Sequence, residues 1–390
     1  MNARSDPTAL GVAPAAARAA PRCRIAVIGI RGLPANYGGL ETCADEVCRR
    51  WVRGGNDVLV YCRSGRYPER HSEFAGIKLR YLPSIPFRSL DTISHTFFCV
   101  LDLIFVRREY RDVHLYNTGN SIFLPLLRLS GKRVVLSGDG IEWKRQKWGR
   151  LAKFVHKLGE RFAARLANDI VVDNEEVGAY YKAKFNAATT LIAYGANELR
   201  IDPEKSATLL ARHGLESGRY FLFVGRIVPE KGVHELIEAY KALSTDFPLV
   251  IIGDDDSRSA YRNAVFREAS DRIRFLGFVY HEDYEQILAN AYLYVSASRL
   301  EGTSPSLLAA MGAGVGSLVN GIPENISTVK GSIPTYAEND VADLVACWQA
   351  LADDPARARA VGESGRQCVR DHYSWDAVAD AYLQLFRKPR

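Results

Sequence analysis

Two series of short apolar segments, separated by helical patterns, constrain the fold of this chain more than any other feature. Strands that are apolar on both faces and alternate with helices are typical of parallel sheets covered by helices on both sides. The sequence therefore predicts an α/β protein with two Rossmann-like, doubly wound domains that face a cleft. The first series comprises residues 24–30, 57–62, 77–82, 112–117, 133–138, 169–174 and 190–194, and the second comprises residues 220–227, 249–254, 273–278, 291–298 and 316–320.

A polar connection at residues 195–219 divides the two series. We predict a first domain at residues 22–196 and a second at residues 197–373, each large enough to bury its own core. An amphipathic helix in the last segment, residues 374–390, is expected to pack back on the first domain. Residues 1–21 are rich in alanine, proline and arginine and lack the apolar core of a signal peptide, so we expect a disordered tail.

Charge is divided unevenly between the halves. Residues 1–195 hold 30 Lys and Arg against 18 Asp and Glu, whereas residues 196–390 hold 21 against 27. Many of the cations fall at residues 137–166, where a solvated helix face is one explanation. The other is an anionic membrane surface or a lipid-diphosphate acceptor, because each cation near a membrane contributes about 1 kcal/mol. No nucleic-acid-binding module is recognisable, so nucleic acid is not an expected partner.

The cysteines and the hydropathy pattern bear on location. Seven cysteines without any CxxC spacing predict neither disulfides nor metal binding and indicate a reducing cytoplasm. No stretch reaches the roughly 20 apolar residues that a membrane-spanning helix needs. The most apolar segment, residues 97–106, contains Asp102, and we predict a buried helix there.

The segment VGRIVPEKG, residues 224–232, places two cations just after a predicted strand. Arg226 leaves the strand end, and Lys231 is expected to begin the next helix. A guanidinium fork and an ammonium point charge at a strand's carboxyl end suit one anion, and a diphosphate is the natural ligand. Simple solvation of two surface charges is the alternative.

A glycine-rich segment, GIRGLPANYGGLET at residues 29–42, follows the first strand. Gly38 and Gly39 stand directly before a predicted helix, whose N–H groups favour an anion. The spacing is not GxGxxG, and no acidic residue ends the second strand, which argues against a nicotinamide dinucleotide. The alternative is that the glycines serve only a turn.

A third segment, SRLEGTSPSLLAAMGAG at residues 298–314, follows a strand of the second series. Glu301 and Gly302 are expected to form a turn, and Ser304 and Ser306 flank a proline that begins a helix. Such a helix start presents N–H donors. Taken alone, the segment is equally well explained as a routine capped helix.

Together the three segments resemble the retaining, nucleotide-sugar-dependent glycosyltransferases of the GT-B fold, in the large group 1 (family 4) class. The GR…EK and EG…LLxAMxxG segments carry that resemblance, which extends over residues 23–387. The segments RGLPANYGGLET and DGIEWKRQKWGR (139–150) resemble a narrower subgroup that includes bacterial rhamnosyltransferases of cell-surface polysaccharide assembly.

The resemblance implies a role for each segment. The residues that match Arg226 and Lys231 hold the donor diphosphate and stabilise the charge that develops on it. Glu301 would hydrogen-bond the hydroxyls of the donor sugar. Asp139, after a strand of the first domain, would face the acceptor or the reacting sugar, and Glu142 is a weaker candidate. The remaining donor-binding residues implied in this way are Gly38, Gly39, Gly302, Thr303, Ser304 and Ser306.

The resemblance also implies that no metal or other cofactor is needed, since fixed cations replace a metal. No DxD-type aspartate pair stands near a strand end, and only the acidic cluster GDDDS, residues 253–257, suggests a metal at all.

One departure concerns the ribose. The class signature has a second glutamate eight residues after the first, and here Ala309 occupies that position. The loss of a charged acceptor costs roughly 1.5–3 kcal/mol of binding. Another group must bind the ribose, or the protein is an impaired or non-catalytic homologue. A nicotinamide oxidoreductase or a sugar-nucleotide epimerase would also use Rossmann-like domains, and both functions stay open at this point.

We therefore expect a glycosyltransferase that moves a sugar from a nucleotide diphosphate-sugar to a saccharide or polyprenyl-diphosphate-linked acceptor in cell-surface polysaccharide synthesis. Retention and rhamnosyl transfer are implied by the resemblance alone. The expected location is the cytoplasm, with association with the inner face of the plasma membrane.

Overall fold

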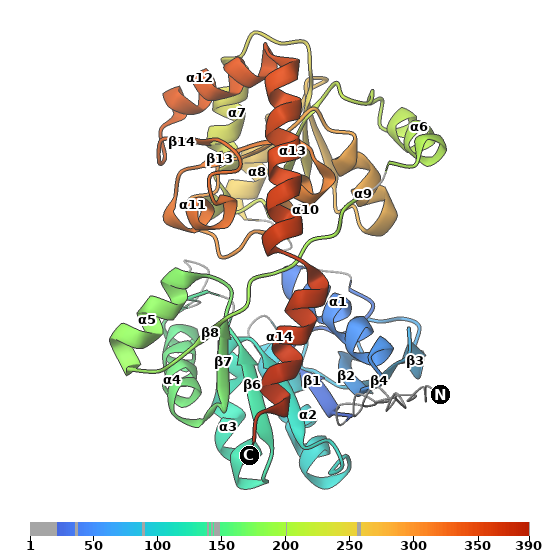
Figure 1. Cartoon of the computed structure of the whole chain (residues 1–390), viewed down its shortest axis with the longest axis vertical. Coiled ribbons are helices and arrows are strands. Elements are labelled where there is room, and N and C mark those ends of the chain that lie inside the picture. Colours follow the sequence, from blue (N-terminus) through green and yellow to red (C-terminus); the bar gives the residue numbers. More distant parts are fainter. Residues whose placement is uncertain are drawn as a thin grey trace, which may run out of the picture.

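The structure is a computed structural model of the 390-residue chain. It describes residues 22–35, 38–87, 90–138, 140–141, 143, 149–199, 201–255 and 259–389. The tail predicted at residues 1–21 lies outside the described residues. Figure 1 shows two α/β domains stacked along the long axis, with the second domain above the first.

The first domain contains an eight-stranded sheet in the order β3-β4-β2-β1-β5-β6-β7-β8. All pairs are parallel except that β3 runs antiparallel to β4. The central strands are buried along nearly their whole length, as expected for a sheet covered on both faces. The strands are β1 (Arg24–Ile28), β2 (Asp57–Arg63), β3 (Glu73–Phe74), β4 (Ile77–Leu82), β5 (Asp112–Tyr116), β6 (Arg133–Ser137), β7 (Asp169–Val172) and β8 (Thr190–Leu191).

The second domain contains a six-stranded parallel sheet in the order β11-β10-β9-β12-β13-β14. From β9 the chain adds strands first on one side, β10 and β11, and then on the other, β12 to β14. Ligands bind beside such a reversal of strand order in open α/β sheets. The strands are β9 (Phe221–Val224), β10 (Leu249–Ile252), β11 (Ile273–Gly277), β12 (Leu293–Ser296), β13 (Gly316–Asn320) and β14 (Thr335–Tyr336).

Helices cover both sheets (Figure 1). Those of the first domain are α1 (Gly39–Arg53), α2 (Leu90–Phe105), η1 (Thr118–Phe123), α3 (Leu124–Leu129), α4 (Arg150–Leu166) and α5 (Glu175–Phe185). Those of the second are α6 (Pro203–Arg212), η3 (Pro229–Lys231), α7 (Val233–Lys241), α8 (Ala260–Phe266), α9 (His281–Ala289), α10 (Pro305–Ala313), α11 (Pro323–Val329), α12 (Val341–Ala352) and α13 (Pro355–His372), followed by α14 (Trp375–Arg387). None of the helices in the described residues is long and apolar enough to cross a membrane.

Several predicted strands are too long at their carboxyl ends. The strand predicted at 24–30 ends at Ile28, because Gly29 takes a φ of 94°. The strand predicted at 220–227 ends at Val224, which leaves Arg226 in a loop. The two-residue strands β3 and β14 were missed, since two residues give no periodic signal.

Helix α2 corrects the prediction of a buried helix at residues 97–106. Cys99, Val100 and Leu103 are buried in the core of the first domain. Phe97 and Phe105, in contrast, lie on an exposed face. The helix is therefore amphipathic, with aromatic side chains on its outer face.

The chain crosses between the domains twice. The first crossing passes Ala196, whose amide donates to the carbonyl oxygen of Tyr373 at 2.8 Å in the second crossing. Helix α14 then lies on the first domain (Figure 1), where the Trp51 indole N–H donates to the Ala379 carbonyl at 2.9 Å. The Trp51 and Phe386 rings also pack edge to face, with centroids 5.7 Å apart.

Candidate functional site

A cavity of about 400 Å³ lies between the two domains. The second domain contributes to it the loop after β9, the loop after β12 and the start of α11. The first domain contributes the start and outer face of α5. Four residues singled out in the sequence, Arg226, Lys231, Glu301 and Gly302, line this one cavity. The other lining residues are Gly140, Ile141, Asn174, Glu176, Val177, Ala179, Tyr180, Ala183, Glu230, Leu300 and Glu324.

The two cations of the loop after β9 reach the cavity by a tight backbone path. Lys231 does not begin an α-helix, as the sequence predicted, but ends the short helix η3. Its amide donates to the Val228 carbonyl at 2.9 Å, and Gly232 follows with a φ of 62°. A side chain at Gly232 would collide with the carbonyl of Ala297 at the end of β12. This close approach brings Lys231 next to the loop that carries Glu301.

Lys231 and Glu301 form an ion pair. Their side chains are only 17% and 9% exposed, so water screens the pair weakly. Within the described residues, Arg226 has no carboxylate partner. Among the described residues, Arg226 is therefore the cavity cation without an ion-pair partner, whereas Lys231 is paired with Glu301.

Carboxylates are more numerous than cations along the cavity wall: Glu176, Glu230, Glu301 and Glu324 line it. Burial raises the pKa of Glu324, and the nearby carboxylates of Glu176 and Glu301 add to the rise. Carboxylates accept hydrogen bonds from hydroxyl groups, whereas guanidinium and ammonium groups bind phosphate oxygens. The wall thus suits a ligand that is rich in hydroxyls and carries phosphate.

Asp173 of the first domain holds the Glu301 loop from the other side. Its Oδ2 accepts a hydrogen bond from the Thr303 amide at 3.3 Å, and the Thr303 hydroxyl donates to the Asp173 carbonyl. A side chain at Gly302 would collide with the Asp173 carboxylate. Gly302 is thus required for the approach of the two domains.

The start of α10 differs from the prediction of exposed N–H donors. Ser304 is buried, and its hydroxyl lies 3.2 Å from that of Ser306, which is in turn 3.0 Å from the Tyr294 hydroxyl. Neither serine nor Thr303 lines the cavity as the structure describes it. They lie instead where the domains meet, because Pro305 packs against the first domain.

The glycine pair marks that same contact. A Cβ on Gly39 would lie 2.8 Å from Cγ of Pro305, so Gly39 permits the start of α1 to touch the start of α10. Gly38 precedes the helix in an extended conformation with a φ of −159°, and a Cβ there would meet only the Glu41 carboxylate at 3.7 Å. Among the described cavity residues, neither glycine lines the wall.

Ala309 lies on the face of α10 that turns toward the first domain. Pro305, Ala309 and Gly312 follow one another at helical spacing on one face. Gly39 abuts Pro305, and a Cβ on Gly312 would lie 2.5 Å from the carbonyl oxygen of Asn197. Ala309 therefore stands between two close contacts of α10 with the first domain and the interdomain crossing.

Some predicted positions fall elsewhere. Asp139 and Glu142 lie outside the described residues, although Gly140 and Ile141 line the cavity. In the acidic cluster at 253–257, Asp254 forms a bidentate pair with Arg262, with an Nη2–Oδ2 distance of 2.7 Å. Within the described residues, no group of three His, Cys, Asp or Glu side chains is arranged to hold a metal ion.

Sequence reasoning missed the first-domain wall, including Glu176 and Tyr180, and it missed Asp173, which holds the Glu301 loop. Asp173 directly follows β7, at the carboxyl edge of the first sheet. The rule that ligands gather at carboxyl strand ends would have found it.

Comparisons with known proteins agree with this architecture. Residues 207–368 match the family described as glycosyl transferases group 1, and residues 120–197 match a domain of unknown function, DUF1972. An alpha-D-kanosaminyltransferase of Streptomyces kanamyceticus is 28% identical over 70% of this chain and 76% of its own length. An alpha-maltose-1-phosphate synthase of Mycobacterium tuberculosis is 32% identical over 48% of this chain and 52% of its own.

Solved structures share the whole two-domain arrangement. A sucrose-phosphate synthase from Thermosynechococcus elongatus has a TM-score of 0.80 at 21% identity, covering 94% of this chain and 99% of its own. Anabaena Alr3699/HepE in complex with UDP-glucose has a TM-score of 0.76 at 14% identity, covering 94% of this chain and 100% of its own. The GT-B fold predicted from the sequence is confirmed.

Proposed function

We propose that this chain, a glycosyltransferase whose second domain carries the group 1 glycosyltransferase match, moves a sugar from a nucleoside diphosphate-sugar to a saccharide acceptor. The observation that carries the proposal is the cavity wall, which Arg226, without an ion-pair partner among the described residues, shares with the Lys231–Glu301 pair. The solved structures of Alr3699/HepE with UDP and with UDP-glucose support a nucleotide-sugar as the donor.

In this mechanism the cations act on the leaving group. Arg226 and Lys231 bind the diphosphate oxygens and stabilise the negative charge that develops there as the glycosidic bond breaks. Glu301 accepts hydrogen bonds from the donor sugar, and its pairing with Lys231 fixes both side chains before the donor arrives. Binding of the diphosphate replaces part of the contact between Lys231 and Glu301, so the ammonium moves little.

We further propose retention of configuration, through a same-face displacement in which the leaving phosphate helps to deprotonate the acceptor. Such a step needs no strong base from the protein. Retention, like rhamnosyl transfer, is supported by the resemblance of the sequence segments. Asp139 remains a proposed residue on the acceptor side.

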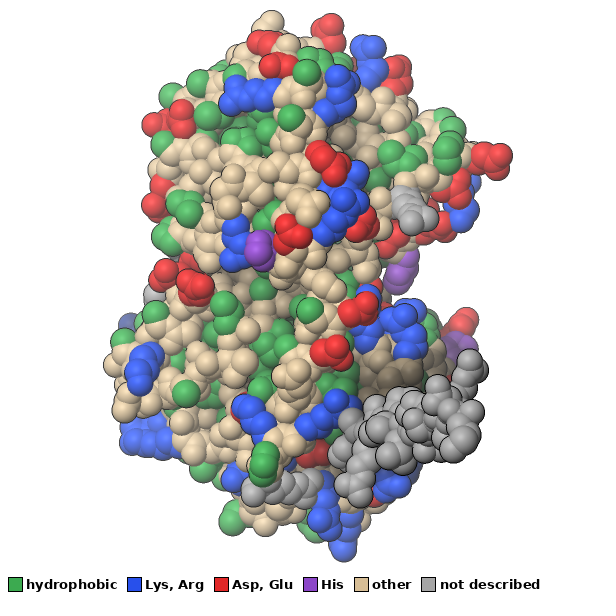
Figure 2. All heavy atoms as spheres, in the orientation of Figure 1, with side chains coloured by type: hydrophobic (Ala, Val, Ile, Leu, Met, Phe, Trp, Pro, Cys, Tyr) green, Lys and Arg blue, Asp and Glu red, His purple; other side chains and the backbone are tan. Residues whose placement is uncertain are grey.

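The proposed setting is cell-surface polysaccharide synthesis at the cytoplasmic face of a membrane. Exposed apolar side chains on two helices support contact with an anionic membrane. The outer face of α2 exposes Phe97 and Phe105, and the first turns of α4 expose Leu151 and Phe154 close to Arg150 in sequence. The space-filling view shows a notch between the domains with basic side chains on its first-domain border (Figure 2).

The alternative is an impaired or non-catalytic homologue, and Ala309 is the observation that favours it. The test is the release of nucleoside diphosphate from a panel of UDP-, dTDP-, GDP- and ADP-sugars, with and without saccharide acceptors. The proposal predicts acceptor-stimulated release from at least one donor. Binding of a donor without any release, in the natural protein and in Ala309→Glu alike, would favour the alternative.

A further inference from the structure

We propose that Arg31, Arg63 and Arg66 form an anion site on the first domain that binds the diphosphate of a lipid-linked acceptor. Exposed apolar side chains beside this cluster contact the hydrocarbon chain of the same ligand. The inference rests on the proposed function, because it names the class of acceptor and its place of binding.

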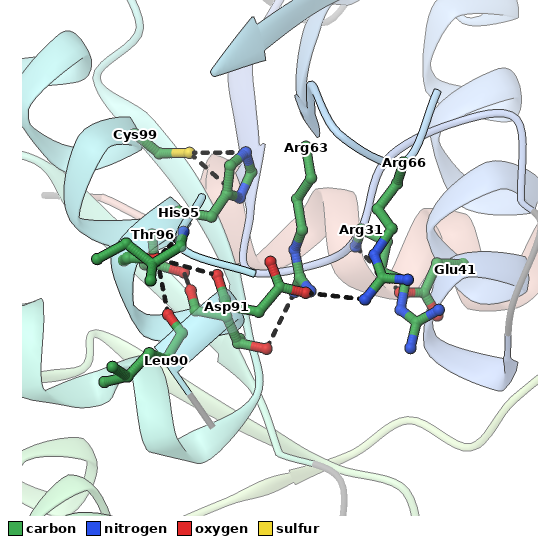
Figure 3. Close-up of polar contacts among 12 residues, drawn as sticks. Arg31, Glu41, Arg63, Arg66, Leu90, Asp91, His95, Thr96 and Cys99 are labelled. Carbon is green, nitrogen blue, oxygen red and sulfur yellow. Dashed lines mark hydrogen bonds and ion pairs between the residues drawn. The ribbon is translucent and has the colours of Figure 1, made fainter. Parts of the chain in front are cut away.

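Three arginines converge at the carboxyl ends of β1 and β2 (Figure 3). Arg63 is the last residue of β2, and its Nη1 lies 2.9 Å from Oδ2 of Asp91 at the start of α2. Nη2 of Arg66, in the turn after β2, lies 3.3 Å from the same oxygen. Arg31 follows β1, and its carbonyl accepts the Arg63 amide at 2.8 Å. One carboxylate oxygen is thus shared by two guanidinium groups, with a third beside them.

Arg63 and Arg66 share the single carboxylate of Asp91, so these two guanidinium groups carry more positive charge than their common partner neutralises. Glu41 also lies at the cluster, and its carboxylate accepts the Arg31 amide at 3.0 Å. Burial raises the pKa of Glu41, which disfavours its charged form. Burial lowers the pKa of Arg63 although the charges of Asp91 and Glu41 act to raise it, and the nearby charge of Arg31 adds to the decrease. A bound anion stabilises the closely spaced positive charges of Arg31 and Arg63.

The cluster has a buried side and an open side. Arg63 is buried, and its Nε has no hydrogen-bond partner in the described residues. The Arg66 side chain is half exposed. An anion is therefore received by Arg66 at the surface, while Arg63 and Asp91 hold Arg66 in place from below.

The position suits an acceptor. The cluster lies at the carboxyl edge of the first sheet, which is the edge that faces ligands in such folds. Glu41 stands in the first turn of α1, two residues after Gly39, which touches Pro305 of the second domain. An anion held by the arginines is thus placed next to the domain contact, on the first-domain side.

Apolar side chains next to the cluster identify the kind of anion. Ile85, Phe87 and Leu90 are each about half exposed or more, and Leu90 directly precedes Asp91. A nucleotide or a free phosphate leaves these side chains in water. A diphosphate attached to a hydrocarbon chain satisfies both the arginines and the apolar side chains, so charge and hydrophobicity are complementary to one ligand.

Farnesyl diphosphate, below its micelle concentration, is the probe for calorimetric titration of the full-length protein. We expect it to bind at least tenfold more tightly than either inorganic diphosphate or farnesol. Arg66→Ala should weaken binding about tenfold or more, as for loss of a charge-assisted contact. Arg70→Ala is the matched control, because this exposed arginine lies over the Tyr81 ring, at 6.0 Å, outside the cluster.

The apolar contact has its own matched pair. Phe87 is 64% exposed, and Leu129, which is 87% exposed, ends α3 just before β6 begins, at the opposite edge of the first sheet. Phe87→Ser should weaken binding of farnesyl diphosphate, and Leu129→Ser should not. Equal losses in both variants would show general adsorption to apolar surface and would overturn the proposal.

Binding at the donor cavity is separated by Arg226→Ala, which should still bind farnesyl diphosphate. If Arg226→Ala abolishes binding while Arg66→Ala leaves it intact, the diphosphate occupies the donor cavity and the acceptor proposal is wrong. The titration needs no turnover, so its outcome is independent of whether donor cleavage, the proposed function, is observed.

Discussion

The main-chain amide of Thr303, in the second domain, lies 3.3 Å from Oδ2 of Asp173, in the first. The Thr303 hydroxyl donates to the Asp173 carbonyl as well, so one residue of the first domain contacts Thr303 through both its backbone and its side chain. Glu301 stands two residues before Thr303 and pairs with Lys231. The position of the cavity's ion pair therefore depends on the approach of the two domains.

Asp173→Ala should lower sugar transfer about tenfold, because the Glu301 loop loses its support, while binding of the nucleoside diphosphate changes little. The effect should appear in kcat more than in KM. Faster hydrogen exchange of the Thr303 amide would report the released loop independently of activity. Glu175→Ala, at an exposed carboxylate close by, serves as the control and should behave as the natural protein does.

Gly39→Ala should hold the start of α1 away from the start of α10, since its Cβ would lie 2.8 Å from Cγ of Pro305. We expect a more open protein in small-angle scattering and a clear fall in transfer. The control is Gly65→Ala, in an exposed turn where a Cβ would meet no atom within 4 Å. Scattering profiles that coincide for Gly39→Ala and the natural protein would be inconsistent with a domain contact at this position.

Glu301→Gln separates the sugar from the phosphate. The variant loses the charge that balances Lys231, so the released ammonium is fully available to a diphosphate. The nucleoside diphosphate of the true donor should bind as tightly as before or more tightly, whereas transfer should fall at least tenfold. Weaker binding of the free nucleoside diphosphate would show that Glu301 contacts the phosphates indirectly rather than the sugar.

We expect the buried His114 to make the free energy of unfolding depend on pH. It is buried, with Nε2 2.8 Å from the Ser137 hydroxyl, and burial lowers its pKa to about 3. The unfolded chain takes up this proton near pH 6.5, whereas the folded protein does not. The contribution of neutral His114 to the free energy of unfolding is therefore complete above about pH 6.5 and is lost as the pH falls toward 3.

Urea unfolding at several pH values between 7 and 4 measures this effect. His114→Gln should reduce the dependence of unfolding free energy on pH by up to about 1.4 kcal/mol per pH unit. His71→Gln, at an exposed position, is the control and should keep the slope of the natural protein. Identical slopes in His114→Gln and the natural protein would exclude His114 as a source of acid sensitivity.

The sequence was sufficient to predict the two sheets and the residues of one wall of the cavity. Arg226, Lys231, Glu301 and Gly302 could be predicted because each lies just beyond a strand of the second sheet, where local patterns are informative. The contact of Gly302 with Asp173 could not be predicted, because these residues are far apart in the chain. They meet only where the two domains come together, and no local sequence pattern encodes that contact.

The same limit explains two wrong predictions of solvent exposure, at the start of α10 and on the outer face of α2. The start of α10 carries the residues of a capped, exposed helix, and the approach of the first domain at Gly39 and Asp173 buries it. The apolar segment at residues 97–106, which includes aromatic side chains of the outer face of α2, was predicted to be a buried helix. In the structure they remain exposed, and hydropathy alone does not distinguish a core face from a binding face.

The central claim is that Arg226 and Lys231 bind the donor diphosphate from the second domain. Calorimetric titration of the true donor with Arg226→Ala and Lys231→Ala tests it most directly, with Arg219→Ala as an exposed control in the same domain. The account predicts that each cavity variant binds the donor roughly 10- to 100-fold more weakly, as expected for the loss of a charge-assisted contact, and that Arg219→Ala binds it normally. Donor affinities of both cavity variants within about twofold of the natural protein would contradict it.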